Sequence, residues 1–185
     1  MGFPYSSSSL MISLLHVLLF IDHSFARTNT DTLGVSLVPE VCQRTPNPDF
    51  CVSALHSDPR TIDINDLGAL LEVSLDLASS NATGTSNKIR SLVLKTRDPA
   101  LKARLEVCVN EYDGALENIE ETNEFLKSGD YDSINLAALG AGNHADSCEG
   151  AFKQSPVYQS PLSTDNLNLK LLSDIAAAIA KMLEA

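Results

Sequence analysis

The sequence lacks the short motifs that mark common catalytic and metal sites. It has no G-x-S-x-G, no H-E-x-x-H, no glycine-rich phosphate loop and no EF-hand loop. Its four cysteines show no C-x-x-C spacing, and the two histidines beyond the N-terminal region, His56 and His144, belong to no recognisable metal pattern. We therefore predict a protein that is not an enzyme and that holds no metal ion and no cofactor.

Basic residues are also scarce, with 13 Lys and Arg against 24 Asp and Glu and a net charge of −11. Nucleic acid and anionic membrane surfaces both require positive charge to neutralise phosphate, so neither is an expected partner. The acidic charge favours a basic protein partner, or it serves only to keep the protein soluble.

An apolar run at the N-terminus extends from Leu10 to Ile21. Its 12 residues are too few to span a bilayer and are typical of the apolar core of a secretory signal. Ser24-Phe25-Ala26 then offers the small-x-small pattern of a cleavage site. The alternative, an N-terminal core helix, would need a sheltered partner because the run has no polar face. We predict a signal peptide over residues 1–26 and one secreted mature domain over residues 27–185.

The cysteines all follow the predicted cleavage site, and an even number in a secreted chain indicates disulfides. They are Cys42, Cys51, Cys108 and Cys148, which allow three pairings. The secretory route also makes Asn81-Ala82-Thr83 a possible N-glycosylation site.

Helical patterns dominate the mature chain, and no strand-type alternation appears. The break at Thr45-Pro46-Asn47-Pro48-Asp49 separates two short segments that carry Cys42 and Cys51, with Asn47 as a helix cap and Pro48 at the first helical position. A small helical hairpin closed by Cys42–Cys51 is the simplest interpretation. Four long helices are expected at 67–96, 98–126, 132–152 and 164–183, with Gly84 interrupting the first. The predicted fold is all-α: an up-down-up-down four-helix bundle with an N-terminal helical hairpin.

The second and third long helices each carry a core stripe that contains one cysteine. In the second, the stripe is broken only by Thr122 and comprises Leu101, Leu105, Cys108, Tyr112, Ala115, Ile119 and Leu126. In the third, it comprises Ile134, Ala138, Ala141, Ala145, Cys148 and Phe152. Cys108 precedes Gly129 by about 31 Å of helix and Cys148 follows it by about 28 Å, at 1.5 Å per residue. The sulfurs therefore reach the same level, which selects Cys42–Cys51 with Cys108–Cys148.

Two other features have simpler structural explanations. The acidic run Glu117, Glu120, Glu121 and Glu124 suggests a solvated helix face more than a metal site or an acid pair. The small residues between Ala138 and Ala145 make the third helix narrow, so that a neighbouring helix can approach closely.

The order and spacing of the cysteines and the residues around them resemble the plant invertase and pectin methylesterase inhibitor family over essentially the whole mature chain. The matching segments are Cys42-Gln43-Arg44-Thr45 through Phe50-Cys51, Ser57-Asp58-Pro59-Arg60, Leu105-x-x-Cys108-x-x-x-Tyr112, Phe125-Leu126-x-Ser128-Gly129-Asp130-Tyr131, and Ser147-Cys148-Glu149 with Phe152. The resemblance implies the same bundle, the same disulfide pairing and an inhibitor of the plant cell wall or vacuole. No vacuolar address is evident, so the extracellular apoplast is the expected location.

The family has two branches with different target enzymes. The resemblance implies that pectin methylesterase inhibitors cover the pectin-binding cleft in a one-to-one complex, and that invertase inhibitors occupy the sucrose site. Many invertase inhibitors carry Pro-Lys-Phe where this chain reads Tyr131-Asp132-Ser133, which is more like the pectin branch. Two departures from that branch are Leu139-Gly140-Ala141, in place of Ser-Ala-Ala, and Gly150, in place of a carboxylate. The expected partner is pectin methylesterase, with acid invertase as the alternative.

We expect a rigid monomer that docks its second and third long helices over an enzyme's substrate cleft and excludes substrate without a covalent step. The candidate contacts are outward polar residues of these helices: Asn110, Asp113, Glu117, Asn135, His144, Asp146 and Ser147. For each of them, a merely solvated surface residue is the alternative. Two further functions compete with inhibition: a helical binding or allergen-like protein with no inhibitory role, and an unrecognised hydrolase.

Overall fold

The structure of the protein, a computed structural model, describes residues 1–2 and 36–185. Apart from Met1 and Gly2, the predicted signal peptide lies outside the described residues and stays a prediction. The described part of the chain contains helices and no strand, which confirms the all-α class. None of the described helices is long and apolar enough to cross a membrane.

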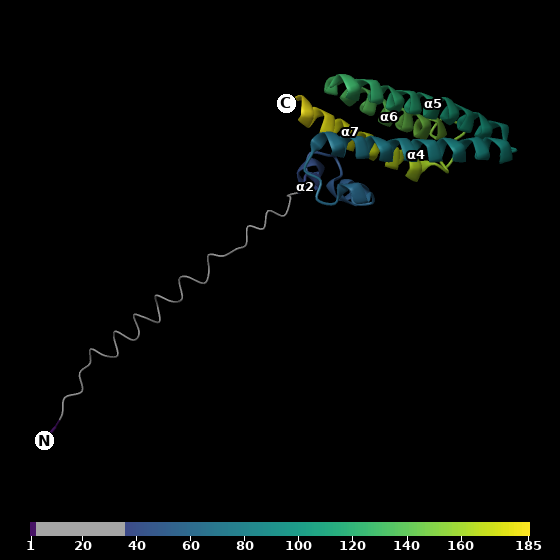
Figure 1. Ribbon diagram of the computed structural model, residues 1–185. Coiled ribbons are helices and arrows are strands. Elements are labelled where there is room, and N and C mark those ends of the chain that lie inside the picture. Colours follow the sequence, from purple (N-terminus) through teal and green to yellow (C-terminus); the bar gives the residue numbers. More distant parts are fainter. Residues whose placement is uncertain (3–35) are drawn as a thin grey trace. The chain divides into compact units, whose positions relative to one another are not determined.

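Four long helices form the bundle: α4 (Leu67–Lys95), α5 (Pro99–Ser128), α6 (Tyr131–Phe152) and α7 (Ser163–Glu184). Figure 1 shows them side by side along a common direction. They close a ring, because α5 packs against α4 and α6 while α7 packs against α6 and α4. Short turns at 96–98 and 129–130, and a longer connection over 153–162, join the successive antiparallel helices. The structure thus confirms the expected up-down-up-down four-helix bundle.

Aspartates begin three of the long helices. Asp66 accepts a hydrogen bond from the Ala69 backbone N–H at 2.7 Å, and Asp98 accepts one from the Ala100 N–H at 2.9 Å. Asp130 accepts from both the hydroxyl and the N–H of Ser133, which lowers the pKa of the Asp130 carboxyl. Such caps satisfy backbone donors that have no partner inside the helix.

The helix ends differ slightly from those predicted. α5 continues to Ser128 instead of ending at Leu126, and α6 starts at Tyr131 instead of Asp132. The reason is that Gly129, with φ +70°, is the residue that leaves the helical conformation. The expected interruption at Gly84 is wrong, since α4 runs unbroken through that residue.

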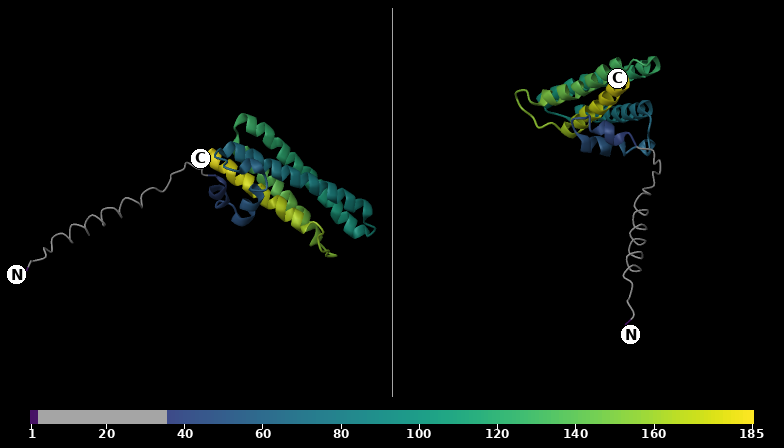
Figure 2. Two further views of the ribbon diagram at one scale, coloured as in Figure 1. Left: turned by 60° about the horizontal axis from the view of Figure 1, so that its bottom comes forward. Right: turned by 90° about the vertical axis from the view of Figure 1, so that its left-hand side faces the viewer.

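The N-terminal hairpin consists of α2 (Val38–Cys42) and α3 (Pro48–Leu55), followed by the short η1 (Pro59–Thr61). Asn47 caps α3 as predicted, accepting a hydrogen bond from the Phe50 N–H at 3.1 Å. The Cys42–Cys51 disulfide joins the two helices, and the hairpin packs against α4 and α7. Figure 2 shows the hairpin lying against the bundle near the C-terminus.

The Cys108–Cys148 disulfide joins α5 to α6 inside the core, with both cysteines fully buried. The structure therefore contains the pairing that the helix lengths select. Thr122, which seemed to break the stripe of α5, is also buried and donates its hydroxyl to the Ile119 carbonyl at 2.6 Å. A threonine that satisfies its own hydroxyl in this way can take a core position.

A polar network crosses the core between α5, α6 and α7. Buried Tyr112 donates its hydroxyl to Asn166 at 2.9 Å, and Asn166 donates its amide to Glu149 at 2.7 Å. Ser163 donates to the other carboxylate oxygen at 2.8 Å. Burial opposes ionisation of Glu149, but the hydrogen bonds from Asn166 and Ser163 outweigh it and lower its pKa. Burial also raises the pKa of Tyr112, and nearby carboxylates add to that effect.

Candidate functional site

The outward surface along the α5–α6 contact is the one on which the predicted inhibitor contacts depend. We call it the α5/α6 face and define it by Glu111, Gly114 and Asn118 of α5 and Gly140 and His144 of α6. Two side chains lie across glycines of the opposite helix: His144 over Gly114, and Asn118 over Gly140. A Cβ atom at Gly114 would come within 2.7 Å of the imidazole Cε1. The glycines therefore let polar side chains lie flat along this face.

His144 also contacts Glu111, with 2.8 Å between its Nδ1 and the carboxylate Oε2. Both side chains are half-buried. A carboxylate can only accept, so the imidazole donates its Nδ1–H in this contact. His144 is consequently held in one orientation on the face rather than extended into solvent.

The seven predicted contact residues do not form one surface. His144 lies on the α5/α6 face, and exposed Ser147 follows it by one turn of α6. Asp113 is engaged by Arg90 of α4 instead. Asn135 points the other way, donating its amide to the Ala177 carbonyl of α7 at 2.9 Å.

The remaining three candidates are exposed. Asn110 borders a hollow that includes Arg90, Val93 and Leu94 of α4. Glu117 lies among the acidic residues of α5. Asp146 makes no side-chain hydrogen bond or ion pair with another of the described residues.

The other four residues of the α5/α6 face were not among the contacts predicted from sequence: Glu111, Gly114, Asn118 and Gly140. A signal for them exists, because Gly114 and His144 are each 15 residues from Gly129, and Asn118 and Gly140 are each 11 from it. Residues equally distant from the turn of an antiparallel hairpin lie at the same level, as Cys108 and Cys148 do.

The acidic run of α5 lies on an exposed stretch of the helix. Within residues 36–185 no group of three or more His, Cys, Asp or Glu side chains could hold a metal ion. Glu117, Glu120, Glu121 and Glu124 are all exposed. The run is the solvated face that the sequence indicated.

Asn81, the residue of the possible glycosylation site, lies within α4 and borders a hollow of about 300 Å³ between α3, α4 and α7. Its side chain is half-buried, and its Oδ1 atom is buried without a hydrogen-bond partner in the described chain. Glycosylation of this residue stays a prediction.

The bundle, the hairpin and both disulfides agree with one protein family. Residues 36–179 match the plant invertase/pectin methylesterase inhibitor family. The chain belongs to this family. The family name describes inhibitors and not enzymes, which agrees with the absence of catalytic motifs.

The relatives of this chain include inhibitors from both branches of the family. A pectinesterase inhibitor of Actinidia deliciosa is 39% identical over 183 residues, which cover 99% of this chain and 98% of that protein. Pectinesterase inhibitor 1 of Arabidopsis thaliana is 32% identical over 93% of both chains. Cell wall / vacuolar inhibitor of fructosidase 2, also from Arabidopsis thaliana, is 31% identical over 80% of this chain and 81% of its own length.

A solved structure supports the fold in the same way. The crystal structure of mutant form A of a pectin methylesterase inhibitor from Arabidopsis has a TM-score of 0.71 at 32% identity. The match covers 80% of this chain and 97% of that one. This chain therefore contains nearly the whole fold of the solved inhibitor.

Proposed function

We propose that this protein is a secreted inhibitor of pectin methylesterase that covers the enzyme's substrate cleft in a non-covalent one-to-one complex. The observation that carries the proposal is the 39% identity to a pectinesterase inhibitor across almost the full length of both chains. The fructosidase inhibitor is similar over only four fifths of each chain. The absence of Pro-Lys-Phe after Gly129 points in the same direction. Acid invertase is the second candidate target, because a named relative inhibits fructosidase.

The architecture supports steric inhibition. Two disulfides, capped helices and a satisfied polar network hold the α5/α6 face in one shape, and a preformed surface loses little conformational entropy on docking. The polar side chains of the face suit an enzyme that binds a polar polysaccharide. No covalent step is needed, because occupation of the cleft is sufficient to exclude substrate.

The decisive experiment mixes the oxidised protein separately with a plant pectin methylesterase and with an acid invertase. We expect loss of methanol release from pectin, unchanged sucrose hydrolysis, and co-elution of the inhibitor and the esterase at the mass of a one-to-one complex. Loss of invertase activity alone would select the other branch. Loss of neither activity would reject inhibition of these enzymes, and turnover of pectin or sucrose by the protein alone would identify a hydrolase.

The docking surface is tested by placing a large side chain on it. Ser147→Arg adds a bulky charge next to His144, whereas Ser53→Arg makes the same change on the exposed side of α3 in the hairpin. We expect Ser147→Arg to weaken inhibition of the esterase at least tenfold, equivalent to about 1.4 kcal/mol. Ser53→Arg should leave it within twofold, and equal effects would mean that α6 is not the docking surface.

Secretion and glycosylation are part of the proposal. Expression of the full chain in a plant secretory system should yield an extracellular, monomeric protein that begins at Arg27, as determined from its intact mass and its elution volume. A mass decrease after glycosidase treatment, abolished by Asn81→Gln, would identify a glycan at Asn81. Retention of residues 1–26 would contradict the predicted signal peptide.

A further inference from the structure

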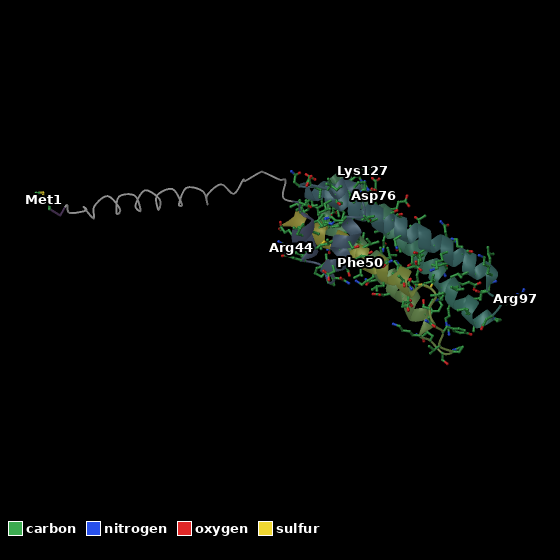
Figure 3. All side chains as sticks on the ribbon, turned by 90° about the horizontal axis from the view of Figure 1, so that it is seen from below. Met1, Arg44, Phe50, Asp76, Arg97 and Lys127 are labelled. Atoms are coloured by element: carbon green, nitrogen blue, oxygen red, sulfur yellow. A yellow bond between two sulfur atoms is a disulfide. The ribbon has the colours of Figure 1, made fainter. Side chains whose placement is uncertain are left out.

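A groove with an apolar floor and acidic walls lies between α4 and α5, outside the α5/α6 face. Its central hollow has a volume of about 260 Å³. Two further hollows, of about 460 and 290 Å³, adjoin it through Asp76, Glu120 and Asn123. Figure 3 labels Asp76 and Lys127 close together, at the end of the bundle opposite Arg97.

The floor of this acidic groove is part of the hydrophobic core. Leu75 of α4 and Ile119 of α5 are each only 6% exposed, and half-buried Leu116 completes the apolar surface. Apolar side chains at the base of an open hollow leave apolar area in contact with water. Such a base favours an occupant that carries a hydrocarbon segment.

Several carboxylates of the groove walls have no basic side chain beside them. No Lys, Arg or His nitrogen of residues 36–185 lies within 4.0 Å of four carboxylates that line the groove: Glu72, Glu117, Glu120 and Glu121. Elsewhere on the same helices, Asp113 is paired with Arg90, and Lys88 of α4 is paired with Asp165. These four carboxylates of the groove therefore have no such partner among the described residues to offset their charge.

These charges are also placed where the helix disfavours them. Glu117, Glu120, Glu121 and Glu124 follow one another at spacings of three and four residues or next to each other, so they repel. A cation bound in the groove relieves this repulsion.

We propose that the acidic groove is a docking site for an arginine- or lysine-bearing segment of a protein partner. The aliphatic part of the basic side chain lies over Leu75, Leu116 and Ile119, and its charged end reaches Glu120 and the neighbouring carboxylates. Long basic side chains bury their stems on apolar surface while the charged end stays polar. At about 260 Å³ the hollow is smaller than most small-molecule sites and has room for one such side chain.

This inference does not depend on which enzyme the α5/α6 face recognises. If the partner is the target enzyme, the groove is a second contact on the adjacent side of α5. If the partner is another basic protein, the two surfaces act separately. In either case the acidic field speeds association with a basic surface and makes binding sensitive to salt.

The test uses the oxidised protein, labelled with ¹⁵N, and a peptide that carries three arginines separated by glycines. A peptide with citrulline in place of each arginine is the control, because citrulline keeps the length and loses the charge. We expect saturable shifts of backbone amides in residues 72–79 and 116–124 with the arginine peptide at low salt. No saturable binding, shifts centred elsewhere, or equal binding of the citrulline peptide would overturn the proposal.

Charge-matched variants separate the groove from the overall field. One variant is Glu117→Gln/Glu120→Gln/Glu121→Gln in the groove. Its control is Glu106→Gln/Asp132→Asn/Glu184→Gln, which removes the same charge from exposed positions elsewhere. We expect the groove variant to weaken binding of the arginine peptide at least tenfold and the control no more than twofold. Equal weakening would show that net charge alone attracts the peptide.

Discussion

The two disulfides close loops of different length, so removing them one at a time should have unequal effects on stability. Cys42–Cys51 spans 9 residues of sequence and Cys108–Cys148 spans 40. In the chain-entropy description, a disulfide stabilises the fold by restricting the unfolded chain, and more so for longer loops. The two separations correspond to about 2.6 and about 3.9 kcal/mol at 25 °C.

Replacing both cysteines of each disulfide by alanine allows the losses of unfolding free energy to be compared directly. All four cysteines are buried, so each double substitution removes two buried sulfur atoms and leaves similar cavities. Those contributions cancel in the difference between the variants. We expect Cys108→Ala/Cys148→Ala to lower the free energy of unfolding by about 1.3 kcal/mol more than Cys42→Ala/Cys51→Ala does.

Urea denaturation followed by far-UV circular dichroism measures this difference, since the four long helices dominate the signal. The thermal midpoint of the variant without Cys108–Cys148 should fall by roughly 8–16 °C for a domain of this size. Equal losses, or a larger loss without the hairpin disulfide, would refute loop closure as the source of the stabilisation. If the slope of the unfolding free energy against urea concentration is the same for both variants, both unfold to comparably exposed chains.

Two further predictions concern side chains that pack between helices. Glu149→Gln should lower the free energy of unfolding by about 1 kcal/mol at pH 7, because it weakens charge-assisted hydrogen bonds from Asn166 and Ser163. The pKa of Glu149 is lower in the folded state than its ordinary 4.5, so its contribution is complete above that value and is lost as pH falls through the folded pKa. Urea titrations from pH 7 down to acid should therefore show wild type and variant converging, and a constant difference would contradict this. Gly140→Ala should force Asn118 away from α6, offsetting a gain in helix propensity of about 1 kcal/mol. In an Asn118→Ala background the same substitution should stabilise the protein, and a double-mutant cycle with no coupling would show that Asn118 moves freely.

The helices were predictable because the signals that start them are local. Asn47, Asp98 and Pro99 lie at the positions where caps and first-turn residues belong, and each needs only the next few residues to act. Gly84 misled the prediction for the opposite reason. Its cost in helix propensity is small beside the packing of α4 against α5 and α7, so the helix continues.

The level of each residue along the α5–α6 hairpin also follows from sequence, since a helix rises by a constant amount per residue. That regularity is sufficient to place Cys108 opposite Cys148. Applied again, it pairs His144 with Gly114 and Asn118 with Gly140.

The chain sequence alone determined the all-α class, the order of the helices and the disulfide pairing, because caps, periodicity and helix rise are local or additive properties. Only the tertiary structure decided which side of the bundle each polar residue occupies. Asp113 pairs with Arg90 of α4 and Asn135 with α7, although both were expected on the same surface as His144. The rotation of each helix about its axis depends on how all its neighbours pack together, and no short segment of sequence contains that information.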